Sequence, residues 1–178
     1  IAREGGQTSA HRSDMSSELD IKATFKSLLE VYGQIDVLHH NVGIGKPGGP
    51  IETSAEDLDR IHAVNVKSLM LCCQQVLPSM VERRTGSIIS IASVAGIRYV
   101  GYPHLAYSTT KAAVVQMTKM IAQQYADKGV RANSVVPGLI DTPRIAANVA
   151  HAFADSLEEA KAARSKQVPM RRMGTPWE

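Results

Sequence analysis

Residues 86–96, Gly-Ser-Ile-Ile-Ser-Ile-Ala-Ser-Val-Ala-Gly, decide the fold of this chain. The isoleucine-rich run over 87–91 is flanked by glycines and predicts a short buried β-strand. A helical pattern follows over 103–126, and a second strand is expected over 130–136, where it ends at Pro137-Gly138. A strand, a long helix and another strand in that order indicate parallel strands joined by a crossover helix.

The same alternation continues upstream. Helical spacing over 16–32 is stopped by Gly33, a short strand is expected over 35–39, and a helix is expected over about 56–83. Pro78 is expected to bend this last helix or to end it early.

Two further elements complete the pattern, a weakly patterned strand over Thr8–Arg12 and a helix over Ser156–Lys166. The whole chain therefore predicts an α/β fold with a parallel sheet. Such sheets bind ligands at the carboxyl ends of their strands. The residues that follow the predicted strands are Asp14, Asn41 to Gly43, Ala92-Ser93 and Pro137-Gly138.

Composition excludes several classes of function. The chain has 178 residues, of which 44% are hydrophobic, enough for one domain with a buried core. A net charge of +3 and 4% aromatic residues argue against a nucleic-acid-binding or membrane-surface protein. No apolar run approaches the ~20 residues that cross a bilayer, and no signal-peptide pattern is found. The adjacent Cys72 and Cys73 match no metal-ligand spacing and are expected to be buried thiols in a reducing, cytoplasmic setting.

Tyr107 and Lys111 are four residues apart on a predicted helix and therefore share one face. A phenol ordinarily has a pKa near ~10, and a neighbouring ammonium favours its phenolate form. A Tyr-x-x-x-Lys pair can therefore act as a tuned acid and base. Such a pair also occurs by chance on many helices, so the pair alone leaves a purely structural role open.

Two other polar residues strengthen the functional interpretation. Ser93 follows the strand that precedes the Tyr107 helix, so its hydroxyl can meet the tyrosine above the edge of the sheet. Asn65 stands inside a predicted helix, where asparagine is unfavourable, which indicates a specific hydrogen-bond partner. In isolation, each is equally compatible with an exposed polar residue.

Five motifs together resemble the short-chain dehydrogenase/reductase family, in the family's order and at family-like spacing. The resemblance covers nearly the whole chain from about Gly5. The matching runs are Ile35 to Gly43, Val64-Asn65-Val66-Lys67, Gly86 to Gly96, Tyr107-Ser108-Thr109-Thr110-Lys111 and Arg131 to Pro143. The resemblance implies a Rossmann-type doubly wound parallel sheet and an oxidoreductase that uses NAD or NADP.

The family's mechanism can be placed on this sequence residue by residue. Tyr107 would exchange the hydroxyl proton of the substrate, and Ser93 would hydrogen-bond the substrate oxygen. Lys111 would hold the nicotinamide ribose and favour the phenolate of Tyr107. Asn65 would position a water molecule that continues the proton relay. The cofactor itself supplies the hydride.

The resemblance also implies a set of cofactor contacts. Asn41, Val42 and Gly43 would pass close to the cofactor's ribose, and Asp14 would hydrogen-bond the adenine with Met15 against it. The residues expected at the nicotinamide end are Pro137, Gly138, Ile140 and Thr142.

One motif departs from the family pattern, which is usually Asn-Asn-Ala-Gly. This chain has His40-Asn41-Val42-Gly43 instead, and His40 is expected to replace a structural hydrogen bond. His39 and His40 should point to opposite faces of their strand, which makes them poor partners for one metal ion.

The family's glycine-rich dinucleotide fingerprint is absent, because Gly43 to Gly49 leads into no helix and fits better as a substrate-side loop. The residue that selects NAD or NADP is absent too. The family's sheet order is 3-2-1-4-5-6-7, of which this chain would supply strands 3, 4, 5 and 6. Strand 3, at Thr8–Arg12, would then lie about 14 Å from strand 4 with nothing between. We therefore expect residues 1–178 to form a single incomplete domain that lacks its first two strands and its last.

Several expectations concern the substrate and partners. Tyr99, Tyr102 and His104 are expected to line the substrate pocket, and about 141–173 would form the family's substrate loop. That loop holds Arg144, Arg164, Arg171 and Arg172, which either favour an acidic substrate or form a solvated face.

The substrate is expected to be a small alcohol or carbonyl compound. A homo-oligomer, tetramer or dimer, is expected through helices 56–80 and 103–126. Their apolar residues, which core packing would also explain, include Leu69, Met70, Leu71, Val114, Val115 and Met117. Two alternatives stay open: a truncated, non-catalytic paralogue, and an enzyme that uses the cofactor for epimerisation or dehydration.

Overall fold

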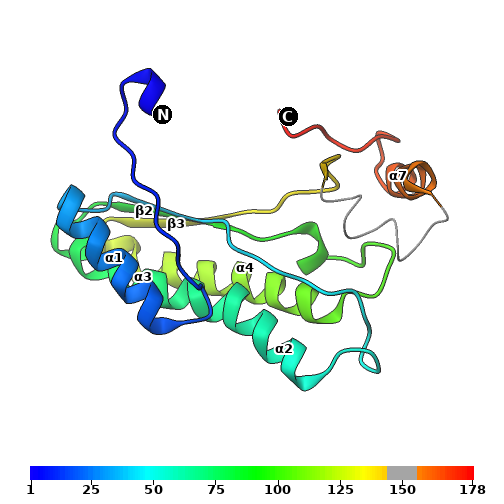
Figure 1. Ribbon diagram of the computed structural model, residues 1–178, viewed down its shortest axis with the longest axis horizontal. Coiled ribbons are helices and arrows are strands. Elements are labelled where there is room, and N and C mark those ends of the chain that lie inside the picture. Colours follow the sequence, from blue (N-terminus) through cyan, green and yellow to red (C-terminus); the bar gives the residue numbers. More distant parts are fainter. Residues whose placement is uncertain (144–155) are drawn as a thin grey trace.

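The computed structural model describes residues 1–143 and 156–178. In this part of the chain a parallel sheet has the strand order β1-β2-β3. Helices α1, α3 and α4 lie together on one side of the sheet, and both termini lie on the other (Figure 1). The elements are β1 (Val37–His40), β2 (Gly86–Ile91), β3 (Val130–Val135), α1 (Glu18–Tyr32), α2 (Ala55–His62), α3 (Ser68–Glu82), α4 (Leu105–Tyr125) and α7 (Leu157–Lys166).

The sheet confirms the predicted α/β fold and the adjacency of the three central strands. β1 pairs in parallel with β2, and β2 with β3, so that Leu38 lies opposite Ile88 and Ile88 opposite Ala132. Because all three strands run the same way, the loops that follow them meet at one edge of the sheet.

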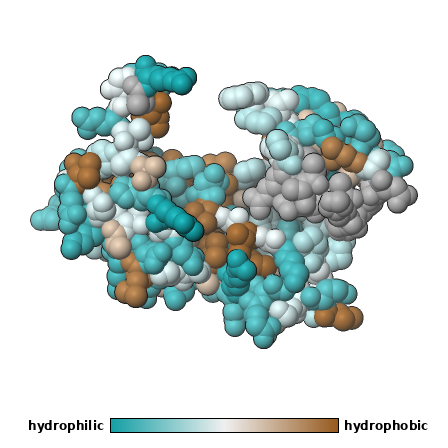
Figure 2. Space-filling view, viewed as in Figure 1, coloured by the Kyte–Doolittle hydropathy of each residue, from teal (hydrophilic) through white to brown (hydrophobic). Residues whose placement is uncertain are grey.

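One main core forms between the sheet and the helices. Leu38, Ile88 and Val130 from the three strands pack with Leu69 and Val114 from α3 and α4. All five side chains are buried. On the face shown in Figure 2, hydrophilic residues predominate and hydrophobic residues gather mainly near the middle.

Three of the helices, α1, α2 and α7, begin after a serine N-cap, and these caps fix the residue at which each helix starts. Ser17, Ser54 and Ser156 each accept a hydrogen bond from a backbone N–H three residues further on. Gly33 ends α1, as predicted, with a positive φ of 76° and an N–H bond to the carbonyl of Leu29.

Two predictions about regular structure are wrong. Thr8–Arg12 forms no strand: the segment is exposed, and no described strand lies beside it to complete a ladder. Pro78 does not end its helix early, because α3 continues to Glu82. Pro78 is exposed, so the carbonyl that loses its N–H partner faces water.

The long helical region is interrupted elsewhere, by a π-helical segment over Ala63–Lys67 between α2 and α3. π-Segments widen a helix by one residue and often occur at functional sites. This segment contains Asn65, the residue that the sequence marks as unfavourable inside a helix.

A smaller cluster joins the C-terminal segment to the loop after β3. Leu139, Ala160 and Met173 are buried together. A parallel bridge between Ile140 and Gly174 holds the two segments in register. Residues 144–155 of the expected substrate loop, including Arg144, lie outside the described residues.

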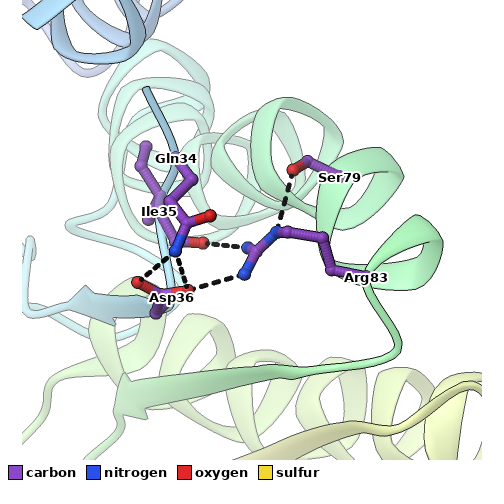
Figure 3. Close-up of polar contacts among 5 residues, drawn as sticks. All are labelled: Gln34, Ile35, Asp36, Ser79 and Arg83. Carbon is purple, nitrogen blue, oxygen red and sulfur yellow. Dashed lines mark hydrogen bonds and ion pairs between the residues drawn. The ribbon is translucent and has the colours of Figure 1, made fainter. Parts of the chain in front are cut away.

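A polar network ties the far end of α3 to the start of β1 (Figure 3). Arg83 Nη1 lies 2.6 Å from the Asp36 carboxylate, and its Nη2 donates to the carbonyl of Ile35 at 3.0 Å. Gln34 and Ser79 complete the network. It fixes the amino end of the sheet, away from the loops that follow the strands.

Candidate active site

A cleft of about 270 Å³ opens at the carboxyl ends of the three strands. Its walls come from the loops after β1, β2 and β3, from the start of α4, and from α7. Predicted site residues that line it are Asn41, Gly43, Ser93, Tyr107, Lys111, Pro137, Gly138, Ile140 and Thr142. The fold therefore brings together residues from four separate motifs of the sequence.

Ser93 stands in a tight turn after β2. Its Oγ accepts a hydrogen bond from the N–H of Ala95 at 3.1 Å, which begins the 3₁₀ turn Val94–Gly96. The N–H of Val94 in turn donates to the carbonyl of Pro137 at 2.9 Å, so the loops after β2 and β3 hold each other. Within the described part of the chain no acceptor takes the hydroxyl proton of Ser93, which leaves that proton for a bound oxygen.

Tyr107 and Lys111 share one face of α4, as the spacing predicts. Lys111 Nζ lies 5.7 Å from the centre of the Tyr107 ring. It also donates to the carbonyl of Ile91, at the end of β2, at 2.7 Å. Lys111 is only 4% exposed, so its charge acts on its surroundings in a poorly hydrated site.

Asn65 has the specific partners that the sequence predicts. Its Oδ1 accepts from the N–H of Ile44, and its Nδ2 donates to the carbonyl of Ile44 and to Thr110 Oγ1, each at 2.9 Å. Thr110 donates onward to the carbonyl of Tyr107 at 2.8 Å. The side chain lies behind the cleft wall and fastens the loop after β1 to the helix that carries Tyr107.

Gly45 lets the same loop lie against Tyr107 and His104. A Cβ atom here would lie 2.9 Å from Tyr107 Cδ2 and 2.7 Å from His104 Nε2, closer than side chains pack. Two hydrogen bonds of Gly48, with the carbonyl of Pro103 and the N–H of Leu105, hold the loop in place. The loop over Gly43–Gly49 thus borders the cleft, as expected of a substrate-side loop.

Aromatic rings form the wall beside Tyr107. His104 stacks on Tyr107 with 4.6 Å between ring centres, and Tyr102 lies 5.2 Å from His104. Tyr102 and His104 line the cleft, as expected. Tyr99 does not: it is exposed and borders an adjoining hollow, because the chain turns outward between Ile97 and Val100.

His40 replaces a structural hydrogen bond, as expected from the departure in its motif. Its Nε2 lies 2.9 Å from Ser68 Oγ. Because Ser68 donates its own proton to the carbonyl of Val64, His40 Nε2 is the donor. Burial, reinforced by the charge of Lys111, lowers the pKa of His40 to about 4, so the ring is neutral near pH 7. His39 is exposed on the opposite face of the strand.

Four predicted site residues do not line the cleft: Asn65, Val42, Asp14 and Met15. Asp14 is exposed before α1, where its carboxylate accepts from the N–H and hydroxyl of Ser16, and these bonds lower its pKa. Met15 packs against the main core. Val42 is half-buried beside the cleft-lining Asn41 and Gly43.

The cleft also contains residues that sequence reasoning did not single out. Val94, Ala95, Val100 and Leu139 are apolar, and nothing in their sequence pattern separates them from core residues. Arg164 lines the cleft from α7, although the sequence alone could not separate it from three other arginines in its region.

Other classes of site are not seen in the described residues. Among residues 1–143 and 156–178, no group of three or more His, Cys, Asp or Glu side chains is placed to hold a metal ion. Burial raises the pKa of Cys72 to about 11 and that of Cys73 to about 12, so both thiols stay protonated, as expected. No helix in the described part of the chain is long and apolar enough to cross a membrane.

Comparison with known proteins identifies related sequences along the chain. A family model described as enoyl-(acyl carrier protein) reductase matches residues 1–178. The chain is 43% identical over 136 residues to 2-(R)-hydroxypropyl-CoM dehydrogenase of Xanthobacter autotrophicus, covering 74% of this chain and 54% of that protein. It is 32% identical to oxidoreductase UcpA of Escherichia coli (strain K12), covering 100% of this chain and 68% of that protein.

Solved structures agree with the sequence matches. A Burkholderia xenovorans protein assigned to the short-chain dehydrogenases/reductases superposes with a TM-score of 0.89 at 33% identity, covering 97% of this chain and 65% of that one. ElxO with NADP bound superposes with a TM-score of 0.82 at 30% identity, covering 94% and 65%. The chain thus spans between about half and two thirds of the length of these proteins. The family-model match and these relatives together show that the chain belongs to the short-chain dehydrogenase/reductase family.

Proposed function

We propose that this protein transfers a hydride between NAD or NADP and a small alcohol or carbonyl substrate, with Tyr107 as general acid and base. The observation that supports this most is the single cleft that Ser93, Tyr107 and Lys111 line together with the backbone of the loops after all three strands. Relatives named as dehydrogenases and a structural neighbour with NADP bound agree with this chemistry.

Ser93 and Tyr107 handle the substrate oxygen. The bond from the N–H of Ala95 orients Ser93 Oγ, so its proton is free to polarise a substrate carbonyl. Tyr107 donates its phenolic proton to the developing alkoxide, or accepts the proton of an alcohol in the opposite direction. The stacked ring of His104 holds Tyr107 against the cleft wall.

Lys111 supplies the positive charge for this proton transfer. Its buried ammonium, held by the carbonyl of Ile91, lies 5.7 Å from the centre of the Tyr107 ring and places a positive charge beside the site of proton transfer. Asn65 is a positioning residue: its Oδ1 accepts from the N–H of Ile44 and its Nδ2 donates to the carbonyl of Ile44 and to Thr110, so it holds the loop after β1 against α4.

The cleft residues fit a nicotinamide cofactor, which supplies the hydride when bound. A Cβ atom at Gly43 would lie 3.0 Å from Lys111 Nζ, so glycine keeps open the space where a ribose would meet the lysine. Asn41 would face the same ribose, and Pro137, Gly138, Ile140 and Thr142 would border the nicotinamide. Val42 would lie beside the ribose, while Asp14 and Met15, outside the cleft, would take the adenine end.

We also propose a homo-oligomer, with a smaller interface than the sequence suggests. Leu69, Leu71 and Val114 are buried in the core, and Val115 and Met117 pack against it. Core packing therefore explains most of the apolar residues of α3 and α4. Leu58 on α2 and Met70 on α3 are each 40% exposed and Met120 on α4 is 46% exposed, so these described residues offer apolar side chains to a second subunit.

The proposed reaction can be tested with deuterium-labelled cofactor. The full chain would be incubated with a panel of ketones and aldehydes and with NADH or NADPH labelled at the transferred position. We expect deuterium at the carbinol carbon of the product. Turnover without deuterium in the product would instead indicate epimerisation or dehydration, and no turnover would indicate the non-catalytic alternative.

A further inference from the structure

Arg164 differs from the other arginines near the C-terminus. It lines the same cleft as Ser93 and Tyr107, although it comes from α7 and follows Tyr107 by 57 residues in the sequence. Arg171 and Arg172 are exposed, and Arg172 forms an ion pair with Glu178 at 2.7 Å. The sequence left open whether these arginines favour an acidic substrate or form a solvated face. Arg171 and Arg172 are on the solvated face, whereas Arg164 is placed to meet a substrate.

Two of the three nitrogen atoms of the Arg164 guanidinium, Nε and Nη1, are shielded from solvent and have no acceptor in the described residues. No carboxylate of the described residues forms an ion pair with it, and the nearby Asp141 is paired with Lys161 at 3.1 Å. A shielded guanidinium with unused N–H groups is unfavourable unless an acceptor reaches it.

Arg164 is held at a defined distance from the reacting groups. Its guanidinium carbon lies 6.0 Å from the centre of the Tyr102 ring, which fixes it by a cation–π contact. The row then continues from Tyr102 to His104 and from His104 to Tyr107. Two aromatic rings therefore stand between Arg164 and Tyr107, so a ligand that touches both needs a spacer of several atoms.

We propose that Arg164 binds an oxyanion on the substrate, such as a carboxylate, sulfonate or phosphate, that a spacer separates from the reacting carbonyl. This inference rests on the proposed function, and it names the substrate class as anionic ketones or their alcohols. A guanidinium matches a planar or tetrahedral oxyanion with two parallel N–H donors. The oxyanion supplies the acceptors that Arg164 lacks and directs the carbonyl to Ser93 and Tyr107.

Paired substrates test the proposal in the full chain. The probes are acetoacetate, 4-oxopentanoate and 5-oxohexanoate, each compared with its uncharged methyl ester. We expect the longer acids to be preferred over their esters in kcat/KM by about tenfold to a hundredfold. Arg164→Gln should remove this preference mainly by raising KM for the acids, with a much smaller change for the esters. Arg164→Lys should restore only part of it, because a lysine lacks the two-pronged geometry.

Lys166→Gln is the matched control, since it removes one positive charge from an exposed position on the same helix. An equal loss in this variant, or equal losses for acid and ester in Arg164→Gln, would overturn the proposal. Calorimetric binding of 5-oxohexanoate to the wild type and to Arg164→Gln tests the oxyanion site separately from the proposed hydride-transfer reaction. Arg164-dependent binding without any reduction supports the oxyanion site and contradicts the reaction, whereas reduction of esters without acid preference contradicts the oxyanion site alone. Unchanged melting temperatures establish that the variants are folded.

Discussion

The two ends of the β1–α3 pair carry polar groups of opposite character. At the amino end of β1, Asp36 pairs with Arg83 at the end of α3 (Figure 3). At the carboxyl end, His40 pairs with Ser68 at the start of α3. Asp36 is 59% exposed, whereas His40 is 4% exposed. The strand and helix are thus fastened at both ends, once in water and once inside the protein.

This difference supports placing the proposed active site at the carboxyl end of the sheet. An exposed ion pair competes with water and salt, so its contribution to binding and stability is small. At the carboxyl end, a buried polar group such as His40 has no water to replace its hydrogen-bond partner, so losing that partner is costly. The Ser93 hydroxyl at this end is held in place by the N–H of Ala95. A site needs such fixed but unused groups.

Tyr107→Phe should have the largest effect, and on chemistry alone. Loss of the phenolic proton should lower kcat by about 100- to 10,000-fold, because proton transfer to the substrate oxygen loses its donor. Cofactor affinity and melting temperature should stay close to wild type. Steady-state kinetics with cofactor titration check this, with Tyr125→Phe at the far end of α4 as the control. Retained turnover in Tyr107→Phe would refute the assignment of the acid and base.

Asn65→Ala should chiefly reduce stability at the carboxyl end. The change leaves the N–H and carbonyl of Ile44 and the hydroxyl of Thr110 without their partner, which should cost about 3 kcal/mol in the free energy of unfolding. Urea unfolding of the full chain measures it. Asn133→Ala, at an exposed position on β3, should change stability by less than about 0.5 kcal/mol. Similar losses in both variants would show that the loop is not anchored through Asn65.

His40 should make the carboxyl end sensitive to acid. Its pKa is about 4 in the folded protein and about 6.5 when unfolded, so below pH 6.5 the unfolded state binds more protons. Stability should therefore fall by about 2 kcal/mol between pH 7 and pH 5 on account of this group. Urea unfolding at both pH values, compared with His40→Asn, isolates the contribution. The same pH dependence in His40→Asn would assign the effect to other groups.

Asp36→Asn should have the smallest effect. The hydrogen bonds from Arg83 and Gln34 lower the pKa of Asp36, but the carboxylate is in water, so the melting temperature should fall by no more than about 2 °C. Differential scanning calorimetry at low and high salt checks this, and the small loss should shrink further at high salt. A loss comparable to that of Asn65→Ala would contradict the contrast between the two ends.

Local sequence patterns predicted the central β1-β2-β3 arrangement well. The runs over 87–91 and 130–136 form strands: the first is a short isoleucine-rich segment that follows a glycine, and the second begins and ends with valine and stops at a Pro-Gly pair. Thr8–Arg12 failed for the opposite reason: a strand exists only beside a partner, and no neighbouring strand is present in the described residues. The expected early end of the helix at Pro78 does not occur, because this proline lies on an exposed face of α3. Water there can bond the carbonyl that loses its N–H partner.

Sequence by itself determined the motifs that contain Ser93, Tyr107 and Lys111 and the parallel order of the strands between them, because residue type and spacing are properties of the chain. Only the tertiary structure decided that Arg164 enters the same cleft, that Asn65 fastens a loop through a π-segment, and that Tyr99 turns away. These outcomes depend on burial and on contacts between distant segments. No local pattern encodes which of several similar side chains a fold will enclose.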